Sequence, residues 1–169
     1  MLKKISVHDI KENIFELIGK RWGVVAVKSN DEKNAMTISW GFFGYIWNKP
    51  GVEIFIHPYR YTHKLLENSE YFTINFFSAE YKDKVMYFGT VSGEDENKIE
   101  KSGLSTIELE NYNTFCFEEA KLVLICKKLY VDTFKKDLFL YKEDYMEDEE
   151  LGILHKFYIG EIVEVLSRE

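Results

Sequence analysis

Hydrophobic and polar positions alternate in short runs along most of the chain, a pattern typical of strands that bury one face. Such runs predict strands at residues 35–40, 52–57, 71–77, 119–131 and 157–166, and the apolar run 22–27 (WGVVAV) predicts a strand buried on both faces. The polar segment 29–33 separates the runs 22–27 and 35–40, so we expect these two strands to form a hairpin. The order of elements lacks a regular strand–helix–strand alternation, which favours an antiparallel sheet.

Short helices are expected between these strands. Ile10, Ile14 and Leu17 recur at helical spacing after Asp9, a candidate N-cap, and predict a first helix that ends near Gly19. A second helix is predicted at residues 62–68. Capping residues and apolar spacing also predict helices that begin after the serines at positions 78 and 92, the last of them ending at a glycine at position 103.

Several segments interrupt this pattern. Gly41 and Gly44 flank two phenylalanines, which suggests a bend or bulge, and the sequence NKPG at residues 48–51 predicts a turn. Residues 143–150 are crowded with negative charges that repel one another, so we expect a solvated loop or an exposed helix there. The run 122–126 is apolar on both faces, so its strand is either central in the sheet or covered by a partner.

Length and composition favour one β-rich domain. A chain of 169 residues suits a single domain, residues 1–169, and no repeat, linker or low-complexity segment divides it. Aromatic residues make up 16% of the chain, and their large rings fit half-buried, pleated surfaces. The predicted fold is mainly β, an antiparallel barrel with several short peripheral helices.

Charge, cysteines and histidines argue against several classes of function. The net charge of −7 opposes general nucleic-acid binding, because a phosphate backbone is held mainly by clustered Lys and Arg. No secretory signal or membrane-spanning apolar run occurs, so we expect a cytoplasmic protein without membrane contact. Cys116 and Cys126 are expected to be reduced, packed thiols. The four histidines are isolated in the sequence, so we expect no metal site.

Signatures of nucleotide binding and of hydrolysis are missing. No GxGxxG follows a strand and no GxxxxGK(S/T) occurs, so neither a doubly wound dinucleotide-binding domain nor a P-loop is predicted. No spacing supports a Ser/His/Asp arrangement. We therefore expect no catalytic nucleophile or general base in the chain.

The strand at residues 36–40 carries a first candidate binding surface. Thr37 and Ser39 place hydroxyl groups on one face, and exposed strand N–H and C=O groups could match the pyrimidine edge of a flavin ring. The alternative is a plain amphipathic strand of a barrel, whose opposite face carries Met36, Ile38 and Trp40.

A second candidate surface begins at Arg60. Arg60, Tyr61, Thr62 and Lys64 surround the predicted start of a helix, with Thr62 as its N-cap. A phosphate is held by charge-assisted hydrogen bonds and by free N–H groups at such a start. The alternative is a capped helix beside a solvated basic patch.

The segment with Ser92, Gly93 and Lys98 offers the same choice. A lysine near a flavin ring would favour the anionic reduced form by Coulomb attraction. Alternatively, Ser92 only caps a helix and Lys98 is an exposed surface residue. His155 by itself is more typical of a partly buried structural histidine.

Taken together, these segments resemble the flavin reductase-like family, which binds FMN on a split β-barrel and includes the flavoredoxins. Two positions depart from the family pattern, with His57 where Arg is common and Asn97 where Asp is common. The matching runs keep the family's order and are NAMTISWG at 34–41, PYRYT at 58–62, Gly89-x-x-Ser92-Gly93-x-Asp95-x-x-Lys98 and His155-x-x-Tyr158-x-Gly160-Glu161.

The resemblance implies an antiparallel split barrel of Greek-key type and a homodimer with FMN near the subunit interface. The partner would also cover the second apolar face of the strand at 122–126, and the aromatic segment 42–47 would pack in the barrel and against the partner. His155 and Tyr158 would reach the cofactor from the partner subunit.

The resemblance also assigns parts of the cofactor to parts of the chain. Residues 36–40 would line the isoalloxazine ring, and Arg60, Thr62 and Lys64 would serve the phosphate and ribityl chain. Ser92 and Lys98 would complete the pocket. The full predicted cofactor-binding set is Asn34, Met36, Thr37, Ile38, Ser39, Trp40, Arg60, Tyr61, Thr62, Lys64, Ser92, Gly93, Lys98, His155 and Tyr158.

The leading hypothesis is an FMN-dependent oxidoreductase of the flavin reductase type that takes electrons from NADH or NADPH. One alternative is a flavoredoxin-like electron carrier reduced by a redox protein, with acidic residues 143–150 docking a basic partner. Another is a non-enzymatic flavin-binding module. In each case the chain supplies binding and electrostatics, and the cofactor carries any chemistry.

Overall fold

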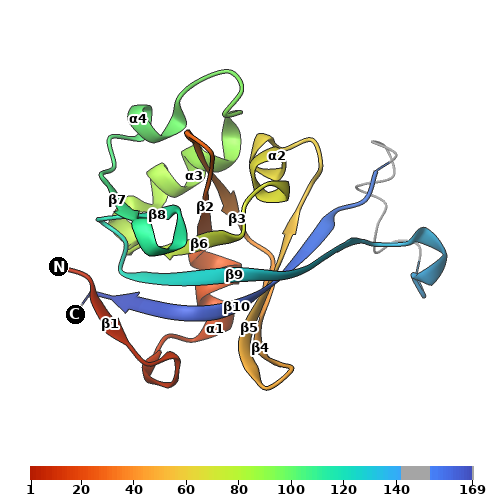
Figure 1. Ribbon diagram of the computed structural model, residues 1–169. Coiled ribbons are helices and arrows are strands. Elements are labelled where there is room, and N and C mark those ends of the chain that lie inside the picture. Colours follow the sequence, from red (N-terminus) through yellow and green to blue (C-terminus); the bar gives the residue numbers. More distant parts are fainter. Residues whose placement is uncertain (142–152, 169) are drawn as a thin grey trace.

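Antiparallel strands dominate the computed structural model, which describes residues 1–141 and 153–168 (Figure 1). The strands are β1 (Lys3–Ile5), β2 (Gly23–Ser29), β3 (Glu32–Ile38), β4 (Gly41–Ile46), β5 (Lys49–Ile56), β6 (Tyr71–Phe76), β7 (Thr106–Leu109), β8 (Thr114–Phe117), β9 (Leu122–Thr133) and β10 (Lys156–Ser167). Eight of them form one sheet in the order β3-β2-β6-β9-β10-β5-β4, with β1 paired to β10. The prediction of a mainly β, antiparallel fold is confirmed, as is the β2–β3 hairpin.

Short helices occupy the connections between strands. In Figure 1, α2, α3 and α4 lie together on one side of the long strands β9 and β10. The α-helices are α1 (Ile14–Glu16), α2 (Tyr61–Glu67), α3 (Lys82–Thr90) and α4 (Lys98–Ser102). A π-helix η2 spans Leu17–Arg21, and single 3-10 turns are η1 (Val7–Asp9), η3 (Ala79–Tyr81), η4 (Glu110–Tyr112) and η5 (Lys136–Leu138).

Strand β9 separates two buried cores. Leu124 belongs to the core that β5, β6 and β10 share, whereas Val123 and Ile125 face the second core with Phe88 and Phe117. All five side chains are at most 1% exposed. Helix α3 and the β7–β8 hairpin therefore cover the second apolar face, so the explanation of this face by a partner subunit is wrong.

The β4–β5 hairpin differs from the prediction of a bend followed by a turn at 48–51. Residues 41–46 pair with β5 along their whole length, and β5 already begins at Lys49. The turn consists of Trp47 and Asn48, whose positive φ angles of 49° and 59° fit a two-residue hairpin. Pro50 is tolerated because it lies at the beginning of its strand.

The helix starts also differ from those predicted. Asn13 caps α1 by accepting hydrogen bonds from the amides of Phe15 and Glu16, whereas Asp9 ends the separate turn η1. The N-cap of α2 is Arg60 rather than Thr62, and no side chain caps this end. Asn97, not Ser92, caps α4. The predicted end of α4 is confirmed, because Gly103 adopts the left-handed conformation with φ of 64°.

The sequence pattern missed β1, β4 and the β7–β8 hairpin. Each strand of that hairpin has four residues, too few to display a clear alternation of polar and apolar positions. The predicted acidic loop or helix at 143–150 lies outside the described residues.

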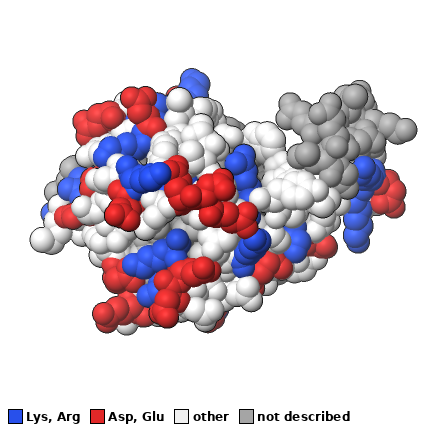
Figure 2. All heavy atoms as spheres, turned by 90° about the horizontal axis from the view of Figure 1, so that it is seen from above, with Lys and Arg blue, Asp and Glu red and all other residues white. Residues whose placement is uncertain are grey.

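Charged side chains of both signs are interspersed on the face that Figure 2 shows. Many of the described charges are paired, such as Lys64 with Glu94 and Lys101 with Glu96. Among residues 1–141 and 153–168, no group of three His, Cys, Asp or Glu side chains could hold a metal ion. Within the same ranges, no helix has the length and apolar character needed to cross a membrane.

Candidate functional site

A cavity of about 510 Å³, here called the β3 cavity, opens beside the end of strand β3. Three separate parts of the chain line it: the end of β3 with the residues after it, the end of β5 with the turn into α2, and the segment before β10. Its volume lies within the range of about 300–1,000 Å³ that is typical of ligand pockets. The lining residues are Met36, Thr37, Ile38, Ser39, Trp40, Phe55, His57, Tyr59, Arg60 and His155.

Strand β3 and the two residues after it contribute half of this lining. Met36 and Ile38 are buried in the core, and the Thr37 hydroxyl donates a hydrogen bond to the Val85 carbonyl in α3. The strand pairs with β2 on one edge, and its other edge has no strand partner among the described residues. The groups that remain for a ligand are thus the backbone edge, the Ser39 hydroxyl and the ring of Trp40, which is 54% exposed.

Arg60 brings a positive charge to the opposite end of the lining. Its Nη1 atom donates a hydrogen bond of 3.3 Å to the Gly89 carbonyl at the end of α3. That single bond leaves most of the guanidinium donors available for an anion. The predicted contribution of Arg60 to this site is therefore compatible with its position.

Lys98 lies near Arg60 and does not line the cavity. Its side chain is buried, and Nζ donates a hydrogen bond of 3.0 Å to the Phe88 carbonyl. Burial, followed by the repulsion of Arg60, lowers the pKa of Lys98 to about 8, and Glu96 offsets part of this. Lys98 thus adds positive charge close enough to Arg60 to interact with it, and the alternative that Lys98 is an exposed surface residue is wrong.

Aromatic rings form much of the cavity wall, and three of them, Phe55, His57 and Tyr59, were not among the predicted site residues. The ring of His57 stacks on Tyr59 at 5.0 Å and meets His155 edge-on at 5.0 Å, and His155 lies 5.2 Å from Trp40. Phe55 in β5 and His57 directly after the strand are two residues apart, the spacing of side chains on one face of a strand, and this signal was present in the sequence. His155 lines the cavity of its own chain. Its approach to the cofactor from the partner subunit stays a prediction.

Asn34 and Thr62 support the cavity from below. Asn34 Nδ2 donates a hydrogen bond of 2.9 Å to Thr62 Oγ1, and both side chains are buried. Gly93 packs against this pair, because a Cβ atom at its position would lie 2.5 Å from Asn34 Oδ1. All three predicted residues therefore have structural roles beside the site rather than positions in its wall.

Three further predicted residues lie outside the cavity. The Tyr61 hydroxyl donates a hydrogen bond of 3.1 Å to Glu32, and Lys64 forms an exposed ion pair with Glu94. The Ser92 hydroxyl accepts a hydrogen bond of 3.1 Å from the Glu94 amide, which closes a turn. None of these three side chains lines the β3 cavity.

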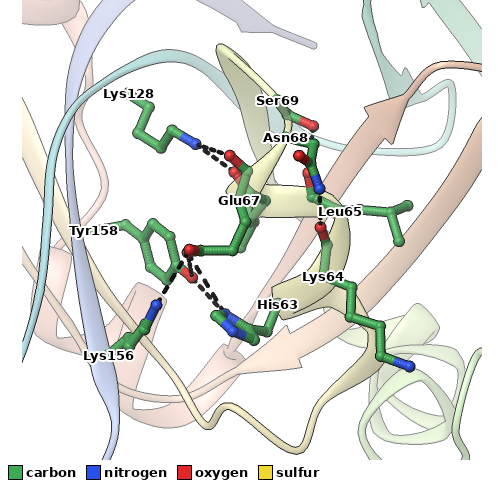
Figure 3. Close-up of polar contacts among 10 residues, drawn as sticks. His63, Lys64, Leu65, Glu67, Asn68, Ser69, Lys128, Lys156 and Tyr158 are labelled. Atoms are coloured by element: carbon green, nitrogen blue, oxygen red, sulfur yellow. Dashed lines mark hydrogen bonds and ion pairs between the residues drawn. The ribbon is translucent and has the colours of Figure 1, made fainter.

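Tyr158 belongs to a different cluster, shown in Figure 3. Its hydroxyl lies 2.7 Å from His63 Nδ1 and donates a hydrogen bond of 2.9 Å to Glu67, which also pairs with Lys156 at 3.1 Å. Burial raises the pKa of Tyr158, so it is a neutral donor. Burial opposes the charged form of Glu67, but the hydrogen bonds from Tyr158 and Lys156 outweigh it and lower the pKa of Glu67. Tyr158 does not line the β3 cavity of its own chain. Its contact with a cofactor bound to the partner subunit stays a prediction.

The residues of the β3 cavity fit a flat, anionic ligand such as FMN. A strand edge and a serine hydroxyl can match ring heteroatoms, aromatic side chains can pack on ring faces, and Arg60 can bind a phosphate. Of the fifteen residues predicted to bind the cofactor, Met36, Thr37, Ile38, Ser39, Trp40, Arg60 and His155 come together in this one cavity.

Comparison with known proteins adds an independent line of evidence. A domain of flavin reductase-like enzymes from Shewanella baltica OS155, named as FMN-binding, superposes with a TM-score of 0.72 at 14% identity, covering 99% of this chain and 77% of that one. The flavoredoxin of Methanosarcina acetivorans gives a TM-score of 0.71 at 21% identity, with 99% and 76% coverage. No curated protein sequence matches this chain.

A third solved structure is the NADH:FAD oxidoreductase SgcE6 of Streptomyces globisporus C-1027 in complex with NAD and FAD fragments. It superposes with a TM-score of 0.66 at 15% identity, covering 87% of this chain and 74% of that one. At these identities the likeness shows the split-barrel fold. The sequence model of the flavin reductase-like domain matches residues 17–169, nearly the whole chain, and the chain therefore belongs to the flavin reductase-like domain family.

Proposed function

We propose that this protein is an FMN-dependent oxidoreductase of the flavin reductase type, with NADH or NADPH as its electron donor. The observation that carries the proposal is the convergence of seven predicted residues from three distant segments on one cavity. Membership of the flavin reductase-like domain family supports the same conclusion. The likeness to SgcE6, solved with NAD and FAD fragments, supports a nicotinamide donor.

The chain's own contribution is binding and electrostatics. Bound FMN supplies the hydride and electron chemistry. The free edge of β3 and Ser39 orient the ring, Trp40 and His57 offer aromatic surfaces to it, and Arg60 binds the phosphate. The positive charge of Lys98 near Arg60 favours negative charge in the cavity. The proposed reaction needs no nucleophilic side chain in the cavity.

The test is a titration followed by a reduction. FMN added to the purified protein should quench its tryptophan fluorescence with saturation, because Trp40 lines the cavity. NADH or NADPH added without oxygen should then bleach the flavin absorbance in a fast, saturable phase. A chain that leaves the fluorescence unchanged upon addition of FMN does not have the proposed function.

A flavoredoxin-like electron carrier is the second candidate, favoured by the likeness to the flavoredoxin of Methanosarcina acetivorans. Such a carrier would bind FMN tightly but would be reduced slowly by both nicotinamides. The reduction experiment separates the two candidates. Fast reduction by a reduced redox protein, lost at high salt, would favour the carrier.

We also propose that the protein is a homodimer. The β4–β5 hairpin exposes Phe42, Tyr45 and Trp47 by more than 60% each, a density of apolar rings that favours association with a second copy. Sedimentation velocity should give a species of about twice the 20.0 kDa chain mass. A monomer at micromolar concentration would contradict this proposal.

A further inference from the structure

A second cavity of about 460 Å³, here called the apolar annex, adjoins the β3 cavity. The two share four wall residues: Ser39, Trp40, Phe55 and His155. Beyond this common wall, the annex extends between β4 and the segments that precede and follow residues 142–152. A ligand in the annex would therefore lie against whatever occupies the β3 cavity.

The described walls of the annex are aromatic and uncharged. Phe42 meets Phe55 edge-on at 5.8 Å, Phe55 stacks on Phe134 at 5.6 Å, and Phe134 lies 5.8 Å from Phe139. No Asp, Glu, Lys or Arg occurs among the described residues that line it. Among its described lining residues, the side chains with polar atoms are Ser39, Trp40 and His155, all on the wall shared with the β3 cavity.

The placement of aromatic and polar side chains in the annex favours some ligands over others. Flat aromatic molecules gain from offset or edge-on contacts with the phenylalanine rings, whereas a phosphate placed among them would lose its hydration without gaining a charged partner. Ser39 lies on the shared side of the annex, and its hydroxyl can donate a hydrogen bond to a carbonyl oxygen. The cavity thus suits a small planar carbonyl compound better than a dinucleotide.

We propose that the apolar annex binds an uncharged, planar aromatic carbonyl compound of the quinone class as the electron acceptor. This inference rests on the function proposed above. FMN bound in the β3 cavity would supply a hydride, and the quinone would take up this hydride with one proton from solvent to become the hydroquinone. A nicotinamide dinucleotide would replace the hydride, so atoms and electrons balance over the cycle.

Binding is tested separately from turnover. Equilibrium dialysis measures the affinity of 1,4-naphthoquinone and of its 2-sulfonate for the protein with and without FMN. The neutral quinone should bind both forms, and the sulfonate should bind at least about tenfold more weakly. Both cysteines are buried with raised thiol pKa values, Cys116 to about 11, so covalent capture of the quinone should not interfere.

Two neighbouring residues provide a matched pair of variants. Phe139 lines the annex, whereas the adjacent Leu138 is 70% exposed and does not. Phe139→Glu should weaken binding of the neutral quinone at least about tenfold, and Leu138→Glu should change it less than about twofold. Phe139→Lys should weaken the neutral quinone and strengthen the sulfonate. FMN affinity should stay the same in all three variants.

The outcomes separate this inference from the proposed function. If the protein binds the quinone but not FMN, the annex is a quinone site and the proposed FMN-dependent function is wrong. If it binds FMN but not the quinone, the proposed function stands and the inference about the annex is wrong. The inference is overturned if the quinone displaces FMN, because the two cavities would then be one site. It is also overturned if Phe139→Glu loses quinone binding together with a change in oligomeric state, seen as a changed sedimentation coefficient. The annex would then be an interface between copies of the chain.

Discussion

Asn34 in β3 donates its buried side-chain hydrogen bond of 2.9 Å to Thr62 in the first turn of α2. The two residues come from two separate motifs, and each motif supplies part of the wall of the β3 cavity. The bond therefore fixes the strand edge relative to Arg60 at the start of α2. A binding site whose two halves are joined by a buried polar contact is preorganised for its ligand.

Replacing Thr62 by Val should loosen this connection. The substitution keeps the shape of the side chain but removes the acceptor, which leaves a buried amide donor of Asn34 without its partner. We expect the free energy of unfolding to fall by about 1–3 kcal/mol in urea titrations. FMN affinity should fall as well. Thr62→Ser retains the hydroxyl and is the control, so equal losses in both variants would show that the hydrogen bond is not the cause.

Arg60 and Lys64 should differ in their effect on FMN binding although both were predicted to serve the phosphate. Arg60 lines the β3 cavity, whereas Lys64 is paired with Glu94 on the surface. We expect Arg60→Met to weaken FMN binding at least about tenfold and riboflavin binding much less, because riboflavin lacks the phosphate. Fluorescence titration measures both ligands.

Lys64→Met is the matched control for that experiment and should leave both affinities within about twofold of the wild type. An equal loss of riboflavin and FMN affinity in Arg60→Met would indicate that Arg60 acts on the ring or on the fold. A loss of FMN affinity in Lys64→Met would restore the original prediction for that lysine.

Much of the fold was predictable because its longer strands carry recognisable apolar or alternating runs. Strands β2, β6, β9 and β10 coincide closely with such runs, whereas β3 ends at Ile38, so Ser39 and Trp40 lie just after the strand rather than in it as predicted. The β7–β8 hairpin was not predicted because its short strands show too little alternation of polar and apolar residues. Strand β4 was not predicted because its two glycines suggested a bend in the chain. The helix caps were misassigned because Asn13 and Asn97 compete with nearby Asp9 and Ser92, and sequence spacing alone does not rank such neighbours.

The candidate site was predictable only in part, since motif residues need not touch a ligand. Asn34, Thr62 and Gly93 are accounted for by packing between β3, α2 and the segment before α4. These three residue types are needed because the three segments pack closely together. From the sequence alone, a residue needed for such packing looks the same as a residue that contacts a ligand. Conversely, His57 enters the wall because β5 ends there, and only the three-dimensional arrangement reveals that His155 lies opposite to it.

Tyr158→Phe should reduce stability without affecting the cofactor. The buried hydroxyl of Tyr158 connects the half-buried His63 and the exposed Glu67 outside the β3 cavity. Its removal should lower the free energy of unfolding by about 0.5–1.5 kcal/mol, because His63 and Glu67 lose a hydrogen-bond partner but water can reach Glu67. FMN affinity should remain within about twofold of the wild type. Weaker FMN binding at unchanged stability would mean that Tyr158 does contact the cofactor, as the family resemblance first implied.

Lys98 should make stability rise with pH. Its folded pKa of about 8 lies below the ordinary lysine value of about 10.4, so between these values the unfolded chain binds more protons than the folded one. The cost of burying the charge is present in full below about pH 8 and disappears as pH rises towards about 10. Lys98→Met should therefore be more stable than the wild type by about 1–3 kcal/mol near pH 7, and this difference should close at high pH. Urea unfolding across the range measures it, with Lys101→Met on the same helix as the control that shows no such closing gap. A difference that stays constant with pH would contradict the burial of a charged Lys98.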